Sequence, residues 1–320
     1  MSQDIPKIFQ IFYAVVPPVG ALGNAIVVYV TLRSKSLRSP CNILIALLSI
    51  GDAVQLTNAT ITMLFYTNAE NNRIRQDLCA YLEMIPIFSS CLALMVLLNI
   101  AIDRLLSLTS FYGSFISRYS KLYIMAHITP ACVFAFSIDV LVLFSIKAEE
   151  VIFCNLTSVM QGLSNELFFK ANFSISVLVI VCYAQFVFFL GKIRMSNEAT
   201  KGIYRSLFII SFSVICGTFM SSLIIMIGEV LRVNVDRTLL VLFAGAFRNT
   251  SFSINFFVYY VTSKLYREEF DKHLGIGFLK NALYRSCLTT GSSNVSRTGL
   301  HTIVRPRIQL SMQSSRSPRR

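Results

Sequence analysis

The side chains that could carry chemistry in this chain are a few charged and polar groups set inside long apolar segments. Asp103 and Arg104 are adjacent where one such segment ends, and Asp52 lies in the middle of another. Charged side chains inside a membrane are expensive, so each is expected to have a function or a partner. The sequence has no Gly-x-Ser-x-Gly, His-Glu-x-x-His or Cys-x-x-Cys motif, and its three histidines are scattered. It therefore predicts neither an enzyme nor a metal site.

Seven segments are long and apolar enough to cross a bilayer, because about 20 helical residues span the roughly 30 Å hydrocarbon core. The segments are 8–32, 42–66, 81–102, 122–146, 171–191, 206–228 and 238–262. Four of them hold one charged residue each, namely Asp52, Glu83, Asp139 and Arg248. The mean hydropathy of +0.63 and the charged fraction of 14% argue against a soluble fold. A β-barrel would instead alternate polar and apolar residues. We expect an all-α membrane protein with a bundle of seven transmembrane helices.

The distribution of basic residues predicts the orientation, because Lys and Arg are retained on the cytoplasmic side. Most of the 29 lie after the first, third and fifth spans and in the tail. The N-terminus is therefore expected outside and the C-terminus in the cytoplasm, and the net charge of +13 reflects topology rather than nucleic-acid binding. We expect residues 1–275 to form the transmembrane domain. Residues 276–320, rich in Ser, Thr and Arg, should form a disordered cytoplasmic tail.

Topology also selects one pair among the eight cysteines. Cys79, at the outer start of the third span, and Cys154, in the second outer loop, share the oxidising side and are expected to form a disulfide. Cys287 lies in the tail and is a candidate for palmitoylation, with a plain thiol as the alternative. Asn155 heads a glycosylation sequon on the outer side.

Three polar residues should meet inside the bundle. Asp52, Asn24 and Asn255 lie near the same depth in the second, first and seventh spans. A cluster filled by water or by a sodium ion near Asp52 would offset the cost of burying them. A local salt bridge from Asp52 to another partner is the alternative.

Several motifs resemble the landmark motifs of rhodopsin-like G-protein-coupled receptors. They are Gly23-Asn24, the Leu-Leu-Ser-Ile-Gly-Asp sequence at 47–52, Cys79, Asp103-Arg104-Leu105 and the Asn-Phe-Phe-Val-Tyr sequence at 255–259. The family usually has tyrosine at the position of Leu105, proline at the position of Phe256 and tryptophans, of which this chain has none. The sequences at 32–42 and 100–107 most resemble the nematode serpentine chemoreceptors of the Srsx class.

The resemblance implies a mechanism in which a small-molecule or peptide ligand binds from outside and a heterotrimeric G protein binds inside. Asp103, Arg104, Asn255 and Tyr259 would form the switch: Arg104 pairs with Asp103 at rest and is freed as the sixth span swings out. Arrestin and a receptor kinase would be further partners, at the tail. The expected location is the plasma membrane, with the sensory cilium as one candidate site. A small-molecule transporter is the alternative, although the sequence has no internal repeat.

The candidate ligand pocket is the set Glu83, Pro86, Ile87, Ser90, Asp139, Arg248 and Asn249. Arg248 needs a partner, which would be Glu83, Asp139 or an acidic group of the ligand. We expect a Glu83–Arg248 pair between the third and seventh spans, with snorkelling to water as the alternative for Glu83, Asp139 and Glu229. Pro86 takes the position at which amine receptors have a carboxylate, which argues against a biogenic amine.

A short helix at 264–274 should follow the seventh span. Tyr266, Phe270 and Leu274 recur at every fourth position, so we expect these three side chains to face membrane lipid.

Overall fold

The structure is a computed structural model that describes residues 5–68, 74–147, 150–152, 154–192, 198–230 and 237–275. The chain separates into two units, Met1–Gly275 and Ile276–Arg320. The predicted tail with Cys287, and the side chain of Glu229, lie outside the described residues.

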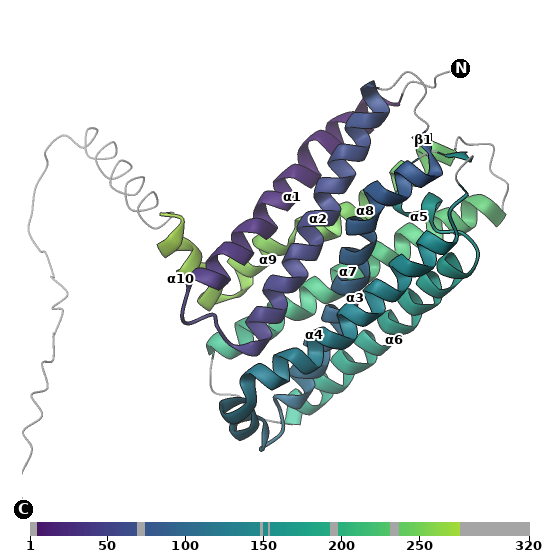
Figure 1. Ribbon diagram of the computed structural model, residues 1–320. Helices are drawn as coiled ribbons and strands as arrows, with labels where there is room; N and C mark the ends of the chain where they lie inside the picture. The colour runs from purple at the N-terminus through teal and green to yellow at the C-terminus, as the bar shows by residue number, and fades with distance from the viewer. Residues whose placement is uncertain are drawn as a thin grey trace, which may run out of the picture. The chain divides into compact units, whose positions relative to one another are not determined.

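Seven transmembrane segments form one bundle (Figure 1). Among the described residues, six helices are each long and apolar enough to cross a membrane: α1 (Lys7–Arg33), α2 (Pro40–Asn68), α3 (Gln76–Leu106), α4 (Tyr112–Phe144), α6 (Leu163–Lys192) and α7 (Glu198–Val230). The seventh segment consists of α8 (Arg237–Ser253) followed by α9 (Asn255–Thr262). The smaller elements are β1 (Ile74–Arg75), β2 (Val151–Ile152), α5 (Leu156–Val159) and α10 (Lys264–His273). The predicted all-α fold is confirmed.

The bundle has its polar groups inside and its apolar groups outside. Asn24 and Asp52 are almost fully buried, whereas Ile11 and Leu22 on the outer face of α1 are about two-thirds exposed. This is the reverse of a soluble protein and suits a hydrocarbon surround, in which backbone groups must be satisfied within each helix. The side chains of the outer faces are therefore available to lipid.

The α4 helix begins earlier than the predicted fourth span. Its backbone is kinked at Tyr119, where φ is −127° and ψ is 30°. The residues before the kink form a short helical piece after α3, and the predicted membrane span follows it. The sequence predicted only the second piece, because only that piece is uniformly apolar.

The seventh segment is interrupted at Ile254, although the proline usual in this motif is replaced by Phe256. Asn24 Nδ2 of α1 donates a hydrogen bond to the carbonyl oxygen of Phe252, at 2.9 Å. In a continuous helix that carbonyl would accept from the amide of residue 256. A side chain that inserts into the helical hydrogen-bond ladder is a known cause of helix breaks. The interruption therefore has a cause other than proline.

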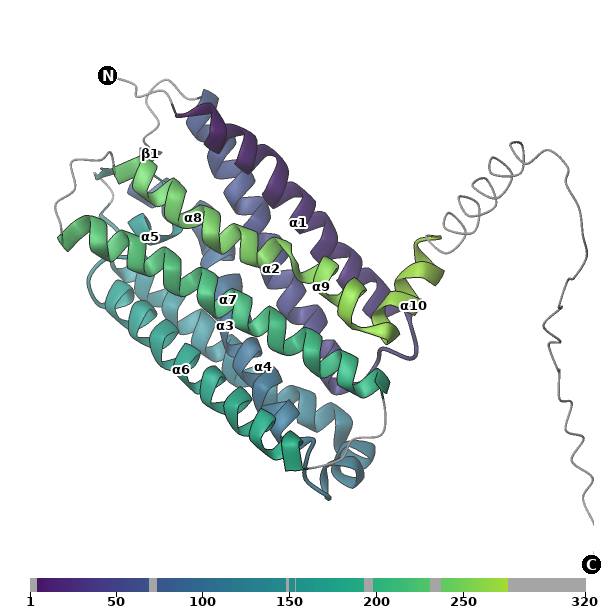
Figure 2. The same cartoon turned by 180° about the vertical axis from the view of Figure 1, so that it is seen from behind.

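Close packing around α1 depends on a small residue. A Cβ atom added to Gly20 would lie 2.5 Å from Cβ and 2.6 Å from Cα of Ser253 in α8. The absence of a side chain at Gly20 thus lets the backbones of α1 and α8 approach each other. Seen from behind, α8 and α9 lie between α1 and α7 (Figure 2).

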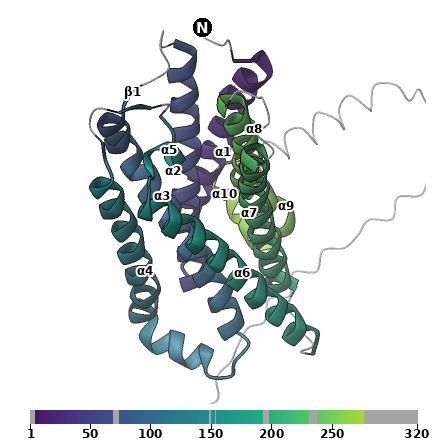
Figure 3. The same cartoon turned by 90° about the vertical axis from the view of Figure 1, so that its right-hand side faces the viewer.

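The two ends of the bundle carry different elements. At one end β1 and β2 pair antiparallel, with Ile74 opposite Ile152, and α5 lies beside them (Figures 1 and 3). The helix α10 lies at the other end. The helix α3 runs through the bundle between these ends and contacts α2, α4 and α6.

The expectation that α10 points its aromatic residues at lipid is wrong. Tyr266 and Phe270 are fully buried. Their rings lie 4.7 Å from Tyr259 and 5.0 Å from Phe256, both on α9. A period of four identifies the apolar face of a helix but does not say whether lipid or protein covers it. Here the aromatic residues of the adjoining helix cover it.

Candidate functional site

The C-terminal end of α3 holds the predicted ion pair. Asp103 is fully buried and pairs with Arg104, whose side chain is 12% exposed. Asp103 Oδ1 also accepts hydrogen bonds from the hydroxyl groups of Tyr112, at 2.6 Å, and Tyr123, at 2.9 Å. A buried ion pair is stable only when further hydrogen bonds satisfy its remaining lone pairs. The two tyrosines of α4 supply them and hold the carboxylate in place, so the arginine is the partner that can leave.

Sequence inspection missed these two tyrosines. They lie on either side of the kink in α4 and carry no motif that relates them to Asp103. The signal that could have found them is chemical, because a buried carboxylate needs donors and the first part of α4 contains Tyr112, Tyr119 and Tyr123.

The polar cluster in the middle of the bundle unites the three residues expected there. Asn255 Nδ2 donates to Asp52 Oδ2 at 2.6 Å and to Asn24 Oδ1 at 3.1 Å. No ion pair reaches Asp52 within the described ranges, in contrast to the alternative of a local salt bridge. Asn255 Oδ1 and the hydroxyl of Tyr259 are buried and make no hydrogen bond to the described residues. The cluster joins α1, α2 and α9 but leaves these two polar atoms unsatisfied.

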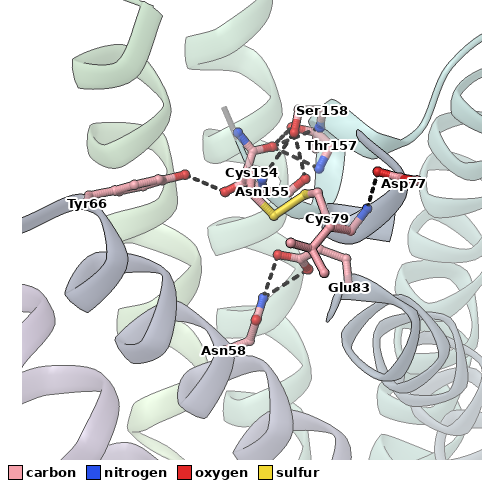
Figure 4. The surroundings of a disulfide bond; sticks show 10 residues. Asn58, Tyr66, Asp77, Cys79, Glu83, Cys154, Asn155, Thr157 and Ser158 are labelled. Carbon is pink, nitrogen blue, oxygen red and sulfur yellow. Dashed lines mark hydrogen bonds between the residues drawn. A yellow bond between two sulfur atoms is a disulfide. The ribbon is translucent and has the colours of Figure 1, made fainter. Parts of the chain in front are cut away.

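The end of the bundle that carries β1 and β2 contains the predicted disulfide. Cys79 and Cys154 are joined with a Cα–Cα distance of 5.5 Å (Figure 4). Tyr66 of α2 donates from its hydroxyl to the carbonyl oxygen of Cys154, at 2.5 Å. Asn155 Oδ1 accepts from the amides of Thr157 and Ser158 and so caps α5. The segment between α4 and α6 is therefore attached to α3 by the disulfide and to α2 by a hydrogen bond.

Glu83 does not have the partner that the sequence predicted. It is 2% exposed, and both its carboxylate oxygens accept from Asn58 Nδ2, at 3.2 and 3.0 Å (Figure 4). In the described part of the chain no ion pair joins Glu83 to Arg248, and Arg248 Nε is buried without a hydrogen-bond partner. The expected pair is therefore not formed, and Asn58 of the neighbouring α2 donates hydrogen bonds to Glu83 instead. Burial also removes the alternative that Glu83 snorkels to water.

Asp139 is buried on α4, at 5% exposure, and its Oδ1 has no hydrogen-bond partner among the described residues. Like Glu83, it does not reach water by snorkelling.

A cavity of about 70 Å³ lies among α2, α3, α5, α6, α7 and α8. Two of the predicted pocket residues, Ser90 and Arg248, line it. The other five lie off its wall: Glu83, Pro86, Ile87, Asp139 and Asn249. The sequence missed several lining residues, namely Gln55, Leu94, Thr157, Phe168, Asn172 and Ser221. Most of these come from α5, α6 and α7, for which the sequence offered no motif.

The cavity is connected to the polar cluster, because Asp52 also lines it. Gln55 donates from Nε2 to the carbonyl of Pro86 and, at 3.1 Å, to Ser89 Oγ, so α2 and α3 are joined beside it. A molecule in this cavity would contact α2, which holds Asp52 of the cluster, and α3, which carries the Asp103–Arg104 pair at its C-terminal end.

Comparison with known proteins matches this chain to a family of receptors. The family model described as serpentine type 7TM GPCR chemoreceptor Srsx matches residues 17–274. The match extends from α1 to the end of α10 and includes the ion pair, the polar cluster, the disulfide and every cavity residue named above. A search of curated proteins finds no match. The chain therefore belongs to the Srsx family of serpentine seven-transmembrane chemoreceptors.

Proposed function

We propose that this receptor binds an extracellular ligand in the cavity and responds by activating a heterotrimeric G protein at its inner end. The observation that carries the proposal is the position of Arg104, buried and ion-paired on the same helix that lines the cavity with Ser90 and Leu94. A ligand that binds one arrangement of α3 better than another shifts the population of the two. Release of Arg104 from Asp103 would then open a site for the G protein.

The polar cluster supports a two-state mechanism. Asn255 Oδ1 and the Tyr259 hydroxyl are buried without partners. Each unsatisfied buried group costs about 1–3 kcal/mol. A rearrangement of α9 that gives these atoms partners would recover part of that free energy. The break at Ile254 supplies a place for α9 to move relative to α8.

We further propose that Asp52 and the free oxygen of Asn255 hold a sodium ion or water. The described residues contain no group of three or more His, Cys, Asp or Glu side chains that could hold a metal ion. One carboxylate with amide oxygens suits a monovalent cation better than a divalent one, since Ca²⁺ takes about six to eight oxygen ligands. Such an ion would satisfy Asn255 Oδ1 in the resting state.

The proposed orientation follows the basic residues, with the disulfide end outside and α10 in the cytoplasm of a plasma-membrane receptor. Arrestin and a receptor kinase are proposed as partners of the tail. A sensory cilium is the proposed location for a chemoreceptor.

Nucleotide exchange on a purified heterotrimeric G protein, in membranes that contain the receptor, tests the proposal. Odorants and peptides are screened for a ligand that accelerates exchange in the wild type. Arg104→Ala should abolish exchange while surface expression stays at the wild-type level. Arg75→Ala is the matched control, because Arg75 forms an exposed ion pair with Asp77 at the outer end.

Exchange at the wild-type rate in Arg104→Ala would refute the switch. Transport of a substrate by the receptor in vesicles without any G protein would instead assign the transporter alternative.

A further inference from the structure

Arg248 is a cation whose guanidinium forms no hydrogen bond with the residues that the structure describes. It lies on α8 and lines the cavity, and its Nε is buried without a partner. Across the described ranges, no hydrogen bond or ion pair reaches its guanidinium. A guanidinium has five N–H donors in a fixed planar fork, which matches the two oxygens of a carboxylate. A guanidinium with free N–H donors on the wall of a cavity can therefore bind an anionic group.

Two carboxylates in this part of the bundle already accept hydrogen bonds from asparagines. Glu83 accepts from Asn58, and Asp52 accepts from Asn255. Glu83 is close enough to attract Arg248 electrostatically, but it forms no ion pair with it. Glu83 thus lowers the cost of burying the charge, and no described residue accepts a hydrogen bond from the guanidinium.

The rest of the cavity wall limits the size and polarity of what can bind. Its polar side chains include Gln55, Ser90 and Asn172, and apolar wall is supplied by Leu94, Phe168 and Phe169. The volume of about 70 Å³ is roughly half that of the 150 Å³ cavity known to hold a benzene molecule. The occupant is therefore a small molecule with one anionic end and a short apolar end.

We propose that the ligand of this cavity is a short-chain carboxylate whose two oxygens bind the guanidinium of Arg248 and whose hydrocarbon tail packs on Phe168 and Phe169. The proposal deepens the proposed receptor function and rests on it. Thr157 of α5 also lines the cavity, so the loop fastened by the Cys79–Cys154 disulfide forms part of the site.

A binding assay that needs no G protein tests the proposal. The purified full-length receptor is heated in lipid nanodiscs with sodium salts of unbranched carboxylic acids of about two to eight carbons. The matched primary amides and alcohols are the chemical controls, and the unfolding temperature reports binding. The acids should raise that temperature in a concentration-dependent way, with shorter chains preferred, and the amides and alcohols should not.

Two substitutions separate the role of the charge from folding. Arg248→Gln should weaken the apparent affinity for the acids by about tenfold to a hundredfold, and Arg248→Lys should weaken it less. The matched control is Lys170→Gln, which removes an exposed cation on α6 and should leave the affinity unchanged. Arg248→Lys also keeps the test decisive if Arg248→Gln does not fold.

Equal stabilisation by acids and amides, an unchanged affinity in Arg248→Gln, or no stabilisation of the wild type by any acid would each overturn the proposal. Failure of the inference is distinguishable from failure of the receptor function. Acids that bind through Arg248 without accelerating nucleotide exchange would support the site and count against the function. A neutral odorant that accelerates nucleotide exchange, with no binding of acids, would support the receptor function and count against the carboxylate site.

Discussion

Removal of the disulfide between Cys79 and Cys154 should destabilise the receptor by an amount that depends on the number of residues between the two cysteines. The two residues are 75 positions apart. In the chain-entropy description, a closed loop of that length stabilises a protein by about 4.5 kcal/mol at 25 °C. That value assumes an unfolded loop that is a random chain. Here most of the loop consists of α3 and α4, which a membrane keeps helical even when the bundle comes apart.

The expected loss is therefore smaller, about 2–4 kcal/mol. Breaking the bridge also frees the segment that Tyr66 holds through the carbonyl of Cys154. Because Thr157 of that segment lines the cavity, ligand binding should weaken together with stability.

The assay is thermal unfolding of the purified receptor and of three variants, Cys79→Ser, Cys154→Ser and the double substitution. Both single variants should lose the same stability, and the double variant should be no worse than either, because each alone already breaks the bond. Cys132→Ser is the matched control, since Cys132 is a free, half-buried cysteine of α4. Additive losses in the double variant, or an equal loss in the control, would refute the reasoning.

Three further predictions concern packing and charge. Gly20→Ala should destabilise the receptor by about 1–3 kcal/mol in thermal unfolding, because the new methyl group meets the backbone of α8. Gly113→Ala is the control and should be neutral, because its methyl group meets nothing within 4 Å. Equal losses in the two variants would contradict this reasoning. Asn58→Ala should cost about 1–3 kcal/mol by removing both hydrogen bonds from buried Glu83, and an unchanged unfolding temperature would count against that contact. Glu269 of α10 is partly buried, which raises its pKa, but hydrogen bonds from serines of the loop between α1 and α2 and nearby cations hold that pKa below its ordinary 4.5. The contribution of ionised Glu269 to the docking of α10 is therefore present above the ordinary pKa of 4.5 and is lost as the pH falls through the lower folded-state pKa. Amide exchange of α10 should be slow at about pH 7 and faster at about pH 3. Unchanged exchange would refute the contribution.

The landmark motifs located the parts of the site that depend on short-range chemistry. Asp103 and Arg104 are neighbours in the chain, so their pairing needs no knowledge of the fold. Asn24, Asp52 and Asn255 could be brought together because equal depth in three spans constrains them to one layer. The disulfide followed from topology, since only two cysteines share the oxidising side.

The contacts that the sequence did not predict depend on how the helices are rotated about their axes. Glu83 could face Arg248 or Asn58 according to the rotation of α2 and α3, and the structure places it against Asn58. The same holds for the aromatic face of α10, which turns to α9 instead of lipid. Membrane helices are apolar on every side, so their hydrophobic pattern carries little information about rotation.

By itself, the sequence determined the seven spans, the family, the inner ion pair, the polar cluster and the disulfide. These depend on charge, on length relative to the bilayer and on depth, which are one-dimensional properties of the chain. Only the tertiary structure decided which side chains line the cavity and which charge has unused donors there. Among the described residues Arg248 has no ion-pair partner, because the packing of α2 against α3 places Asn58 against Glu83. Helix packing is set by the fit of whole surfaces rather than by any local run of residues.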